Sequence, residues 1–176
     1  MSAHGIINRG IIDRAKVWAY GDNVDTDVLA PGLYMKSPPE EMAKHCLEIV
    51  DPDFVPNVRP GDVICAGRNF GMGSSREQAA QSLVFHGVAA VLAPSFGGIF
   101  YRNAINHGLM ALVCADAPKI TAGSHVSIDA VAGKVRDLDG GADYACDPMP
   151  PHFLAMLADG GLVPHLEKRF ANRETA

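Results

Sequence analysis

The stretch from Val63 to Val113 constrains the fold more than any other part of the sequence, because short apolar segments alternate there with segments of helical periodicity. Three of the apolar segments are expected to be strands: 63–66, 88–93 and 109–113. This β-α-β-α-β order, with strands that are apolar throughout, predicts an α/β fold built on a parallel sheet with right-handed crossovers.

Two helices are expected between these strands. Ser74 or Ser75 is expected to open the first helix, and Gly87 is expected to close it in the left-handed conformation that glycine tolerates. The second helix is expected over about residues 98–107. Ligands of parallel sheets bind at the carboxyl ends of the strands. The glycine-rich loop 67–73, which follows the first of these strands, is therefore expected at a binding site.

The segment before this core is expected to hold a strand at 17–20 and a helix at about 38–49. Ser37 is the expected N-cap of that helix, with Pro38 as its first residue and Glu40 as the partner in a capping box. Four residues with helical spacing are expected to form its buried stripe: Met42, Ala43, Cys46 and Leu47.

The segment after the core is expected to add a small antiparallel hairpin and two helices. Apolar residues between 126 and 138 flank glycine-containing turns, which is typical of such a hairpin. The helices are expected at about 151–159, closed by Gly160-Gly161, and at 164–171. This tail is interpreted as structural.

Length and charge restrict the classes of partner. A chain of 176 residues suits a single domain, here with an N-terminal extension over residues 1–15. The formal net charge of −5 and the scattered basic residues argue against a nucleic-acid surface. No apolar run has the length of a membrane span, and no signal-peptide pattern opens the chain. A cytoplasmic protein without a membrane partner is expected.

The cysteines and histidines do not indicate a metal site. Four cysteines are spread along the chain without a C-x-x-C pair: Cys46, Cys65, Cys114 and Cys146. The seven histidines also lack the spacing of metal ligands. The cysteines are expected to be buried thiols, and neither a metal nor an iron–sulfur cluster is expected in this chain.

The segment from Gly67 to Glu77 combines three glycines, two serines and Arg76 at a junction of strand and helix. Such a junction presents backbone N–H groups to an anion, and arginine adds a two-point clamp for a carboxylate. The spacings Ser74-x-x-Glu77 and Ser75-x-x-Gln78 also fit capping boxes. On spacing alone the capping interpretation is favoured.

The segment 21–31 contains three aspartates and suggests a cation loop at first sight. Its spacing misses the calcium pattern, because Leu33 stands where a bidentate glutamate is required. On spacing alone an Asx-rich turn leading into a strand is favoured.

Taken together, three segments resemble the 3-isopropylmalate dehydratase small subunit family. They are Asp25-Thr26-Asp27 followed by Pro31-Gly32, then Asn69-Phe70-Gly71-x-Gly73-Ser74-Ser75-Arg76-Glu77, then Phe100-Tyr101-Arg102-Asn103-Ala104-Ile105-Asn106. The resemblance covers about residues 16–170. It implies the swivelling domain of the aconitase superfamily, with three layers (β/β/α) and a partly open barrel. It also implies a large partner subunit that carries a [4Fe–4S] cluster.

The resemblance further implies roles for five residues. Ser74 would act as the base that removes a proton next to a carboxylate, while the cluster iron of the large subunit acts as Lewis acid on the departing hydroxyl. Ser75 and Arg76 would hold substrate carboxylates, and Asp27 would lie near the polar network of the site. Lys36 would lie on a loop that meets the variable end of a small di- or tricarboxylate substrate, and it is expected to be exposed.

Several positions depart from the family pattern and leave the substrate open. Met72 replaces a cysteine, Gln78 a histidine, Gly97-Gly98 an Ala-Arg pair, and Leu33 an arginine. Leucine biosynthesis through 3-isopropylmalate is the leading assignment. Homoaconitase, dimethylmalate dehydratase and maleate hydratase small subunits remain alternatives within the class, and a non-catalytic carboxylate-binding module is the rival outside it.

Overall fold

The structure is a computed structural model, and it describes residues 10–174. Residues 1–9 and 175–176 lie outside the described part of the chain. The expected N-terminal extension therefore falls mostly outside it, whereas residues 11–15 lie in the first strand.

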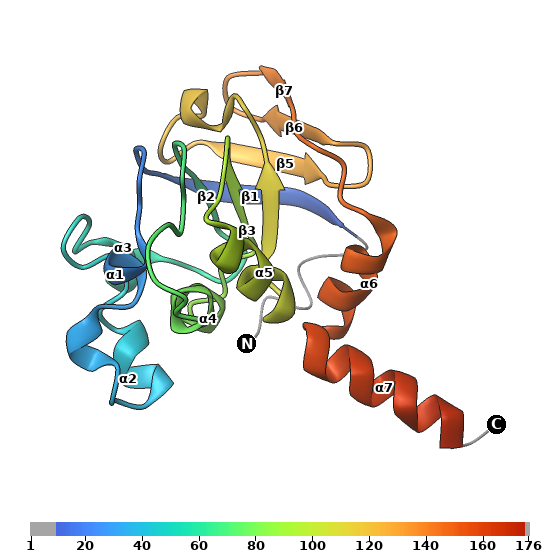
Figure 1. Cartoon of the computed structure of the whole chain (residues 1–176). Coiled ribbons are helices and arrows are strands. Elements are labelled where there is room, and N and C mark those ends of the chain that lie inside the picture. Colours follow the sequence, from blue (N-terminus) through green and yellow to red (C-terminus); the bar gives the residue numbers. More distant parts are fainter. Residues whose placement is uncertain (1–9, 175–176) are drawn as a thin grey trace.

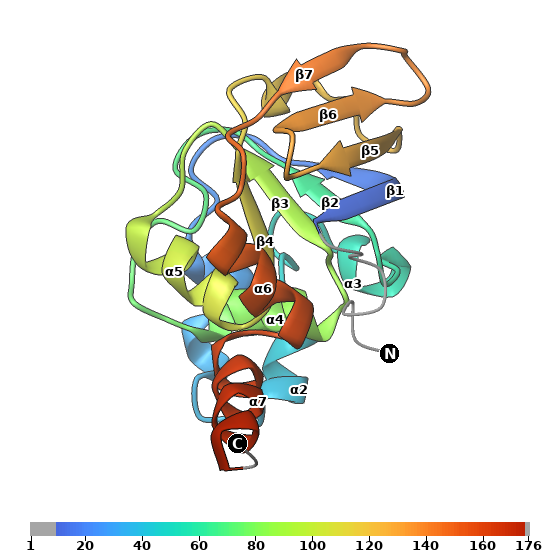
Figure 2. The same ribbon diagram turned by 90° about the vertical axis from the view of Figure 1, so that its right-hand side faces the viewer.

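In the described chain, seven strands form one mixed sheet in the order β4-β3-β2-β1-β5-β6-β7. Their bounds are β1 Ile11–Ala19, β2 Val63–Cys65, β3 Ala90–Ala93, β4 Met110–Val113, β5 His125–Asp129, β6 Lys134–Asp137 and β7 Asp143–Ala145. β1 is parallel to β2 and antiparallel to β5, so it joins a parallel half to an antiparallel half. The whole sheet curves into a half-barrel (Figures 1 and 2).

The helices follow the strands in the expected order. Their bounds are α1 Thr26–Leu29, α2 Pro39–Ala43, α3 Phe54–Asn57, α4 Gln78–Phe85, α5 Gly98–Asn106, α6 Pro151–Asp159 and α7 Leu162–Glu174. β2, α4, β3, α5 and β4 form the predicted β-α-β-α-β unit, and its three strands are parallel. Gly87 follows α4 with a φ of +75°, which confirms its predicted position.

The core lies on both faces of the parallel strands. Val63 and Cys65 of β2 belong to one buried cluster, which also includes Leu157 of α6. Ile64, between them, belongs to a second cluster, which packs against α1, α2 and α4. Because successive side chains of a strand point to opposite faces, a strand buried on both sides must be apolar at every position. This is the reason for the continuous apolar runs in the sequence.

The strand expected at 17–20 is longer and begins earlier, at Ile11. Its side chains alternate unevenly, with Ile12, Ala15 and Val17 buried. Polar residues between them face solvent, so the apolar signal of a half-exposed strand was too weak to mark its start.

The helix expected at 38–49 is much shorter. α2 begins at Pro39, its N-cap is Pro38, and no side-chain cap is formed, so the expected capping by Ser37 is wrong. The chain turns at Leu47, whose φ is +63° and whose N–H donates to the carbonyl of Val28 at 2.9 Å. A tertiary hydrogen bond therefore replaces the helical one. The four residues of the expected buried stripe are nevertheless buried: Met42, Ala43, Cys46 and Leu47.

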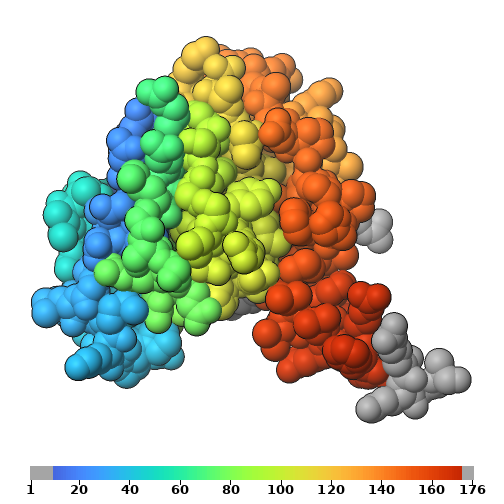
Figure 3. Space-filling model, viewed as in Figure 1, coloured from blue at the N-terminus to red at the C-terminus, as the bar shows by residue number. Residues whose placement is uncertain are grey.

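The expected hairpin is part of a three-stranded antiparallel meander, β5-β6-β7. α6 has the predicted bounds and is followed by Gly160 in the left-handed conformation, with a φ of +95°. α7 begins two residues earlier and ends three residues later than the predicted 164–171. It points away from the rest of the chain, as the red helix in Figures 1 to 3 shows. None of the helices in residues 10–174 is both long and apolar enough to cross a membrane.

Candidate active site at the carboxyl ends of the parallel strands

Three loops meet at the carboxyl ends of β1, β2 and β3. The loop after β2 lies between the other two, as the green band in Figure 3 shows. On one side the N–H of Gly71 donates to the carbonyl of Val24 at 2.7 Å. On the other side the N–H of Gly97 donates to the carbonyl of Phe70 at 2.8 Å. The loop 67–73 therefore lies at the carboxyl end of β2, as predicted.

Two glycines explain how closely these loops approach. A Cβ atom on Gly71, whose φ is +73°, would lie 2.1 Å from the ring of Phe100. A Cβ atom on Gly97 would lie 2.5 Å from the carbonyl oxygen of Gly71. Larger side chains would separate the loops. Of the Gly97-Gly98 pair, only the first glycine has such a packing reason, because Gly98 faces open space.

Asp25 begins a helix, so the expected turn into a strand is wrong. Its carboxylate accepts a hydrogen bond from the N–H of Val28 at 2.9 Å and caps the four-residue helix α1. Aspartate caps turns and helices by the same type of bond, and the spacing therefore did not distinguish them.

Thr26 fixes the backbone of Ser74. It is buried, with 1% of its surface exposed. Its N–H donates to the carbonyl of Met72 at 2.9 Å, and its hydroxyl oxygen accepts from the N–H of Ser74 at 3.0 Å. Two of the three segments that carry the resemblance are thus connected through Thr26.

Neither serine caps the following helix. α4 begins at Gln78, its N-cap is Glu77, and no side-chain cap is formed. The expectation that Ser74 or Ser75 opens this helix is wrong, and so is the capping interpretation of their spacing. Both serines are exposed at the surface. The two serines therefore lie in the loop before α4, ahead of its N-cap Glu77.

Arg76 is held in place by the loop after β1. Its Nη1 group donates to the carboxylate of Asp27 and, at 3.2 Å, to the carbonyl of Ala30. The Arg76 side chain is 21% exposed, and that of Asp27 is 64% exposed. The hydrogen bond from Arg76 lowers the pKa of the Asp27 carboxyl below its ordinary value, and the Arg76 charge and the N–H of Gly32 act in the same direction.

The loop that carries Lys36 begins beside this pair. The position of a Cβ atom on Gly32 would be 3.4 Å from Nη2 of Arg76 and 3.4 Å from the Asp27 carboxylate. Lys36 itself is exposed, as expected. The structure therefore brings Asp27, Ser74 and Arg76 into one region, with Ser75 next to them in sequence. In the described chain no hydrogen bond or ion pair joins Lys36 to any of them.

The cysteines do not fit the ligand set of a cluster. All four are buried and unpaired with one another, as predicted. Burial raises the pKa of Cys65 to about 12 and that of Cys146 to about 12, so the thiolates that a metal requires are disfavoured. In residues 10–174 no group of three or more His, Cys, Asp or Glu side chains is placed to hold a metal ion.

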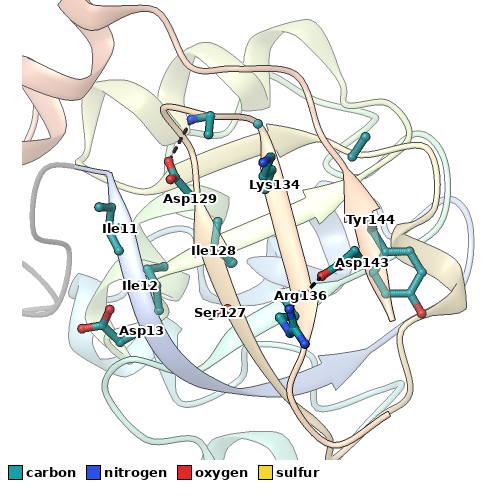
Figure 4. A pocket seen from close by; sticks show the side chains of 13 residues that line it. Ile11, Ile12, Asp13, Ser127, Ile128, Asp129, Lys134, Arg136, Asp143 and Tyr144 are labelled. Atoms are coloured by element: carbon teal, nitrogen blue, oxygen red, sulfur yellow. Dashed lines mark hydrogen bonds and ion pairs between the residues drawn. The ribbon is translucent and has the colours of Figure 1, made fainter. Parts of the chain in front are cut away.

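An open hollow of about 790 Å³ lies away from this site, on the outer side of the antiparallel strands (Figure 4). It extends to Ile11 and Asp13, at the amino end of β1, whereas the three loops meet at the carboxyl ends. Its charges are mixed, since Arg136 lies 3.9 Å from Asp143. Among its lining residues the three aspartates outnumber Lys134 and Arg136, so the hollow has no net positive charge.

Sequence reasoning missed the residues that position the loop. Thr26 was given no role beyond its place in the Asp25-Thr26-Asp27 motif. Asn69 and Ser95 were not singled out, although the N–H of Asn69 donates to the Ser95 hydroxyl at 2.9 Å and its side chain donates to Asn23 at 2.9 Å. Asn23 and Asn69 both have a φ of +61°, a conformation that asparagine adopts more readily than most residues. Asparagine in a glycine-rich loop was the available signal.

Comparisons with known proteins agree on one family. The family described as the aconitase C-terminal domain matches residues 33–117. The small subunit of methanogen homoaconitase from Methanothermobacter thermautotrophicus is 50% identical over 163 residues, which cover 90% of this chain and 92% of that protein. The 3-isopropylmalate dehydratase small subunit from Nautilia profundicola is 46% identical over 149 residues, covering 84% of this chain and 90% of that protein. A crystal structure of 3-isopropylmalate dehydratase from Methanocaldococcus jannaschii superposes with a TM-score of 0.87 at 40% identity, covering 94% of this chain and 98% of that chain.

Proposed function

Because the chain belongs to the 3-isopropylmalate dehydratase small subunit family of the aconitase superfamily, we propose that it completes the active site of a hydro-lyase. The reaction would be the dehydration and rehydration of a small hydroxy acid that carries two or three carboxylates. The observation that carries this proposal is the convergence of Asp27, Ser74 and Arg76 at the carboxyl ends of the parallel strands.

Ser74 is proposed as the catalytic base. Its hydroxyl is exposed, its backbone is held by Thr26, and it is not used as a helix cap. A general base must reach the proton that it removes and must not be occupied by a structural hydrogen bond. The positive charge of Arg76, two residues later, would stabilise negative charge that develops on the serine oxygen as it removes the proton.

Arg76 and Ser75 are proposed to bind a substrate carboxylate. The Nη1 group of Arg76 is used by Asp27 and Ala30. The guanidinium has further N–H groups on Nη2 and Nε, and in the described chain no hydrogen bond from these two nitrogens is found. Asp27 would therefore orient the guanidinium, and the remaining N–H groups would bind the carboxylate.

The cluster is proposed on a large partner subunit, because the buried, protonated thiols of this chain do not fit it. A [4Fe–4S] cluster bound there would supply the Lewis acid for the hydroxyl group. The isolated chain would then have no dehydratase activity.

The substrate is proposed to be 3-isopropylmalate, with its 2-isopropylmalate isomer, since several relatives are named for that activity. A second candidate is a tricarboxylate of the homoaconitate type. It is favoured by the 50% identity to a homoaconitase small subunit and by the basic side chain of Lys36 on the loop beside Arg76.

The proposal is tested by mixing the purified chain with the large subunit encoded in the same genome. Turnover of 3-isopropylmalate and of homoaconitate is measured for each subunit alone and for the mixture. We expect activity only in the mixture, with a preference for one of the two substrates. A mixture that forms the complex and binds a carboxylate, yet does not turn it over, would support a non-catalytic carboxylate-binding module instead.

A further inference from the structure

The loop that begins beside Arg76 packs against the core cluster through the side chain of Tyr34. Leu33 is 85% exposed and Met35 is 37% exposed. Lys36 is exposed as well. Tyr34, between Leu33 and Met35, is half-buried and packs against the second core cluster, which lies against α1, α2 and α4. The loop therefore exposes Leu33 and Lys36, covers Met35 in part, and packs Tyr34 against the core.

Tyr34 stacks on His45, which follows α2. The two ring centroids are 3.6 Å apart, and the ring planes differ by 6°. The His45 ring is also held at its edge, because its Nδ1 lies 2.6 Å from a carboxylate oxygen of Glu48 and its Nε2 lies 3.9 Å from one of Glu41. His45 is 22% exposed, so the ring that Tyr34 meets has little freedom to move.

The backbone hydrogen bonds of the loop are local. The N–H groups of Tyr34, Met35 and Ser37 donate to the carbonyls of Pro31, Gly32 and Tyr34. Such bonds shape the loop, but they do not fix its position relative to the rest of the site. The first end lies against the Asp27–Arg76 pair, because a Cβ atom on Gly32 would be 3.4 Å from the Asp27 carboxylate and 3.4 Å from Nη2 of Arg76. The ring of Tyr34 is the group that fixes the far end.

We propose that His45 is a positioning residue, and that its stack with Tyr34 holds the loop Leu33–Lys36 beside Arg76 and so helps to select the variable end of the substrate. The positioning follows from the ring contact itself. Its consequence for substrate selection rests on the proposed function. A solvated surface histidine that only pairs with Glu48 is the competing interpretation.

The stack is tested first on the isolated chain, where no activity is needed. Trypsin cleaves after Lys36 when the loop opens, and the rate of appearance of the fragment 1–36 is followed by mass spectrometry. Proteolysis of a transiently open segment follows the population of the open form. Loss of a stacked ring pair is expected to accelerate this cleavage about two- to tenfold in His45→Ala.

Three further variants separate stacking from the ion pairs and from general destabilisation. His45→Phe keeps a flat ring and is expected to restore slow cleavage, whereas Glu48→Gln is expected to leave it nearly unchanged. The control His152→Ala removes a histidine that contacts the ring of Phe153 on α6, away from the loop. Equal cleavage of His45→Ala and wild type, or fast cleavage of His45→Phe, would overturn the proposed anchor.

The consequence for selection is tested on the assembled enzyme. His45→Ala is expected to raise KM, and to change the ratio of kcat/KM between a dicarboxylate and a tricarboxylate substrate, with a smaller effect on kcat. His45→Phe is expected to restore the wild-type ratio. If His45→Ala accelerates cleavage of the loop but leaves the ratio of kcat/KM unchanged, the role of His45 in substrate selection is overturned. The role of its stack with Tyr34 as the anchor of the loop is then retained. If the wild-type assembly has no turnover, the proposed function fails, and the proteolysis result still decides the anchor.

Discussion

Arg76 is paired with the carboxylate of Asp27, although the two residues lie 49 positions apart in the chain. The pair connects the loop after β2 to the loop after β1, and the carbonyl of Ala30 accepts a second hydrogen bond from the same guanidinium. A guanidinium held in this way has a fixed plane before a ligand arrives. In the proposed site the Arg76 side chain therefore loses little conformational entropy when a substrate carboxylate binds to it.

Replacement of Arg76 by lysine tests the two-point geometry. Arg76→Lys keeps the charge but loses the planar group that reaches Asp27, Ala30 and a carboxylate together. Loss of one hydrogen bond to a charged group corresponds to about 1.5–3 kcal/mol, so KM of the assembled enzyme is expected to rise at least about tenfold. Arg68→Lys is the matched control, because Arg68 is 72% exposed on the same loop. Unchanged kinetics in Arg76→Lys would rule out the two-point role.

Replacement of Ser74 by alanine separates a catalytic from a structural role. The side chain is exposed and forms no helix cap, so Ser74→Ala is expected to change the free energy of unfolding by less than about 0.5 kcal/mol. Loss of a general base is expected to lower kcat about 10²- to 10⁴-fold, with KM nearly unchanged. The measurements are the kinetics of the assembled enzyme and Tm of the chain. An active but destabilised variant would contradict the catalytic role.

Much of this arrangement was predictable from local patterns, and the remainder depended on contacts between distant segments. The strands of the parallel half were identified because both of their faces are buried, as Val63 and Ile64 illustrate. The helix start after the loop was misplaced because Ser74 fits a capping box by spacing, while its N–H is bonded to Thr26, 48 residues away. Spacing rules describe the local chain, and at this site tertiary hydrogen bonds decide the conformation.

The thiols are expected to be unreactive in the folded chain. Burial raises the pKa of Cys65 and of Cys146, and thiol reagents attack the thiolate. At pH 8 the native chain is expected to react slowly with a thiol reagent, and all four cysteines of the denatured chain are expected to react quickly.

The same purified chain, treated with iron and sulfide, is expected to bind no stoichiometric cluster. Rapid labelling of the native chain or a stable cluster would contradict the proposed division between subunits.

The junction of α6 and α7 is expected to loosen in acid. Asp159, 15% exposed, pairs with Lys168 and His165, and the hydrogen bonds from these two residues lower the pKa of its carboxyl below the ordinary value of 3.8. A carboxyl group whose pKa is lower in the folded state stabilises that state at pH values above its ordinary, unfolded-state pKa. This contribution is lost as the pH falls through the lowered pKa of the folded state. Amide hydrogen exchange in α7 is therefore expected to accelerate below about pH 4 relative to the core strands. Asp159→Asn is expected to show the faster exchange already at pH 7, and wild-type protection of α7 in that variant would contradict the role of the pair.

Replacement of Lys36 by methionine tests the alternative substrate class. Leu33 and Met35 on the same loop suit an apolar group, while Lys36 could meet a third carboxylate or remain in solvent. Lys36 is exposed in the isolated chain, and exposed ion pairs contribute about 1 kcal/mol or less. Lys36→Met is therefore expected to change the preference between dicarboxylate and tricarboxylate substrates by less than about tenfold, which corresponds to about 1.4 kcal/mol. The measurement is kcat/KM for 3-isopropylmalate and homoaconitate in the assembled enzyme. A larger loss confined to the tricarboxylate would show that Lys36 binds its third carboxylate in the complex, and the homoaconitase-like assignment would then replace the leading one.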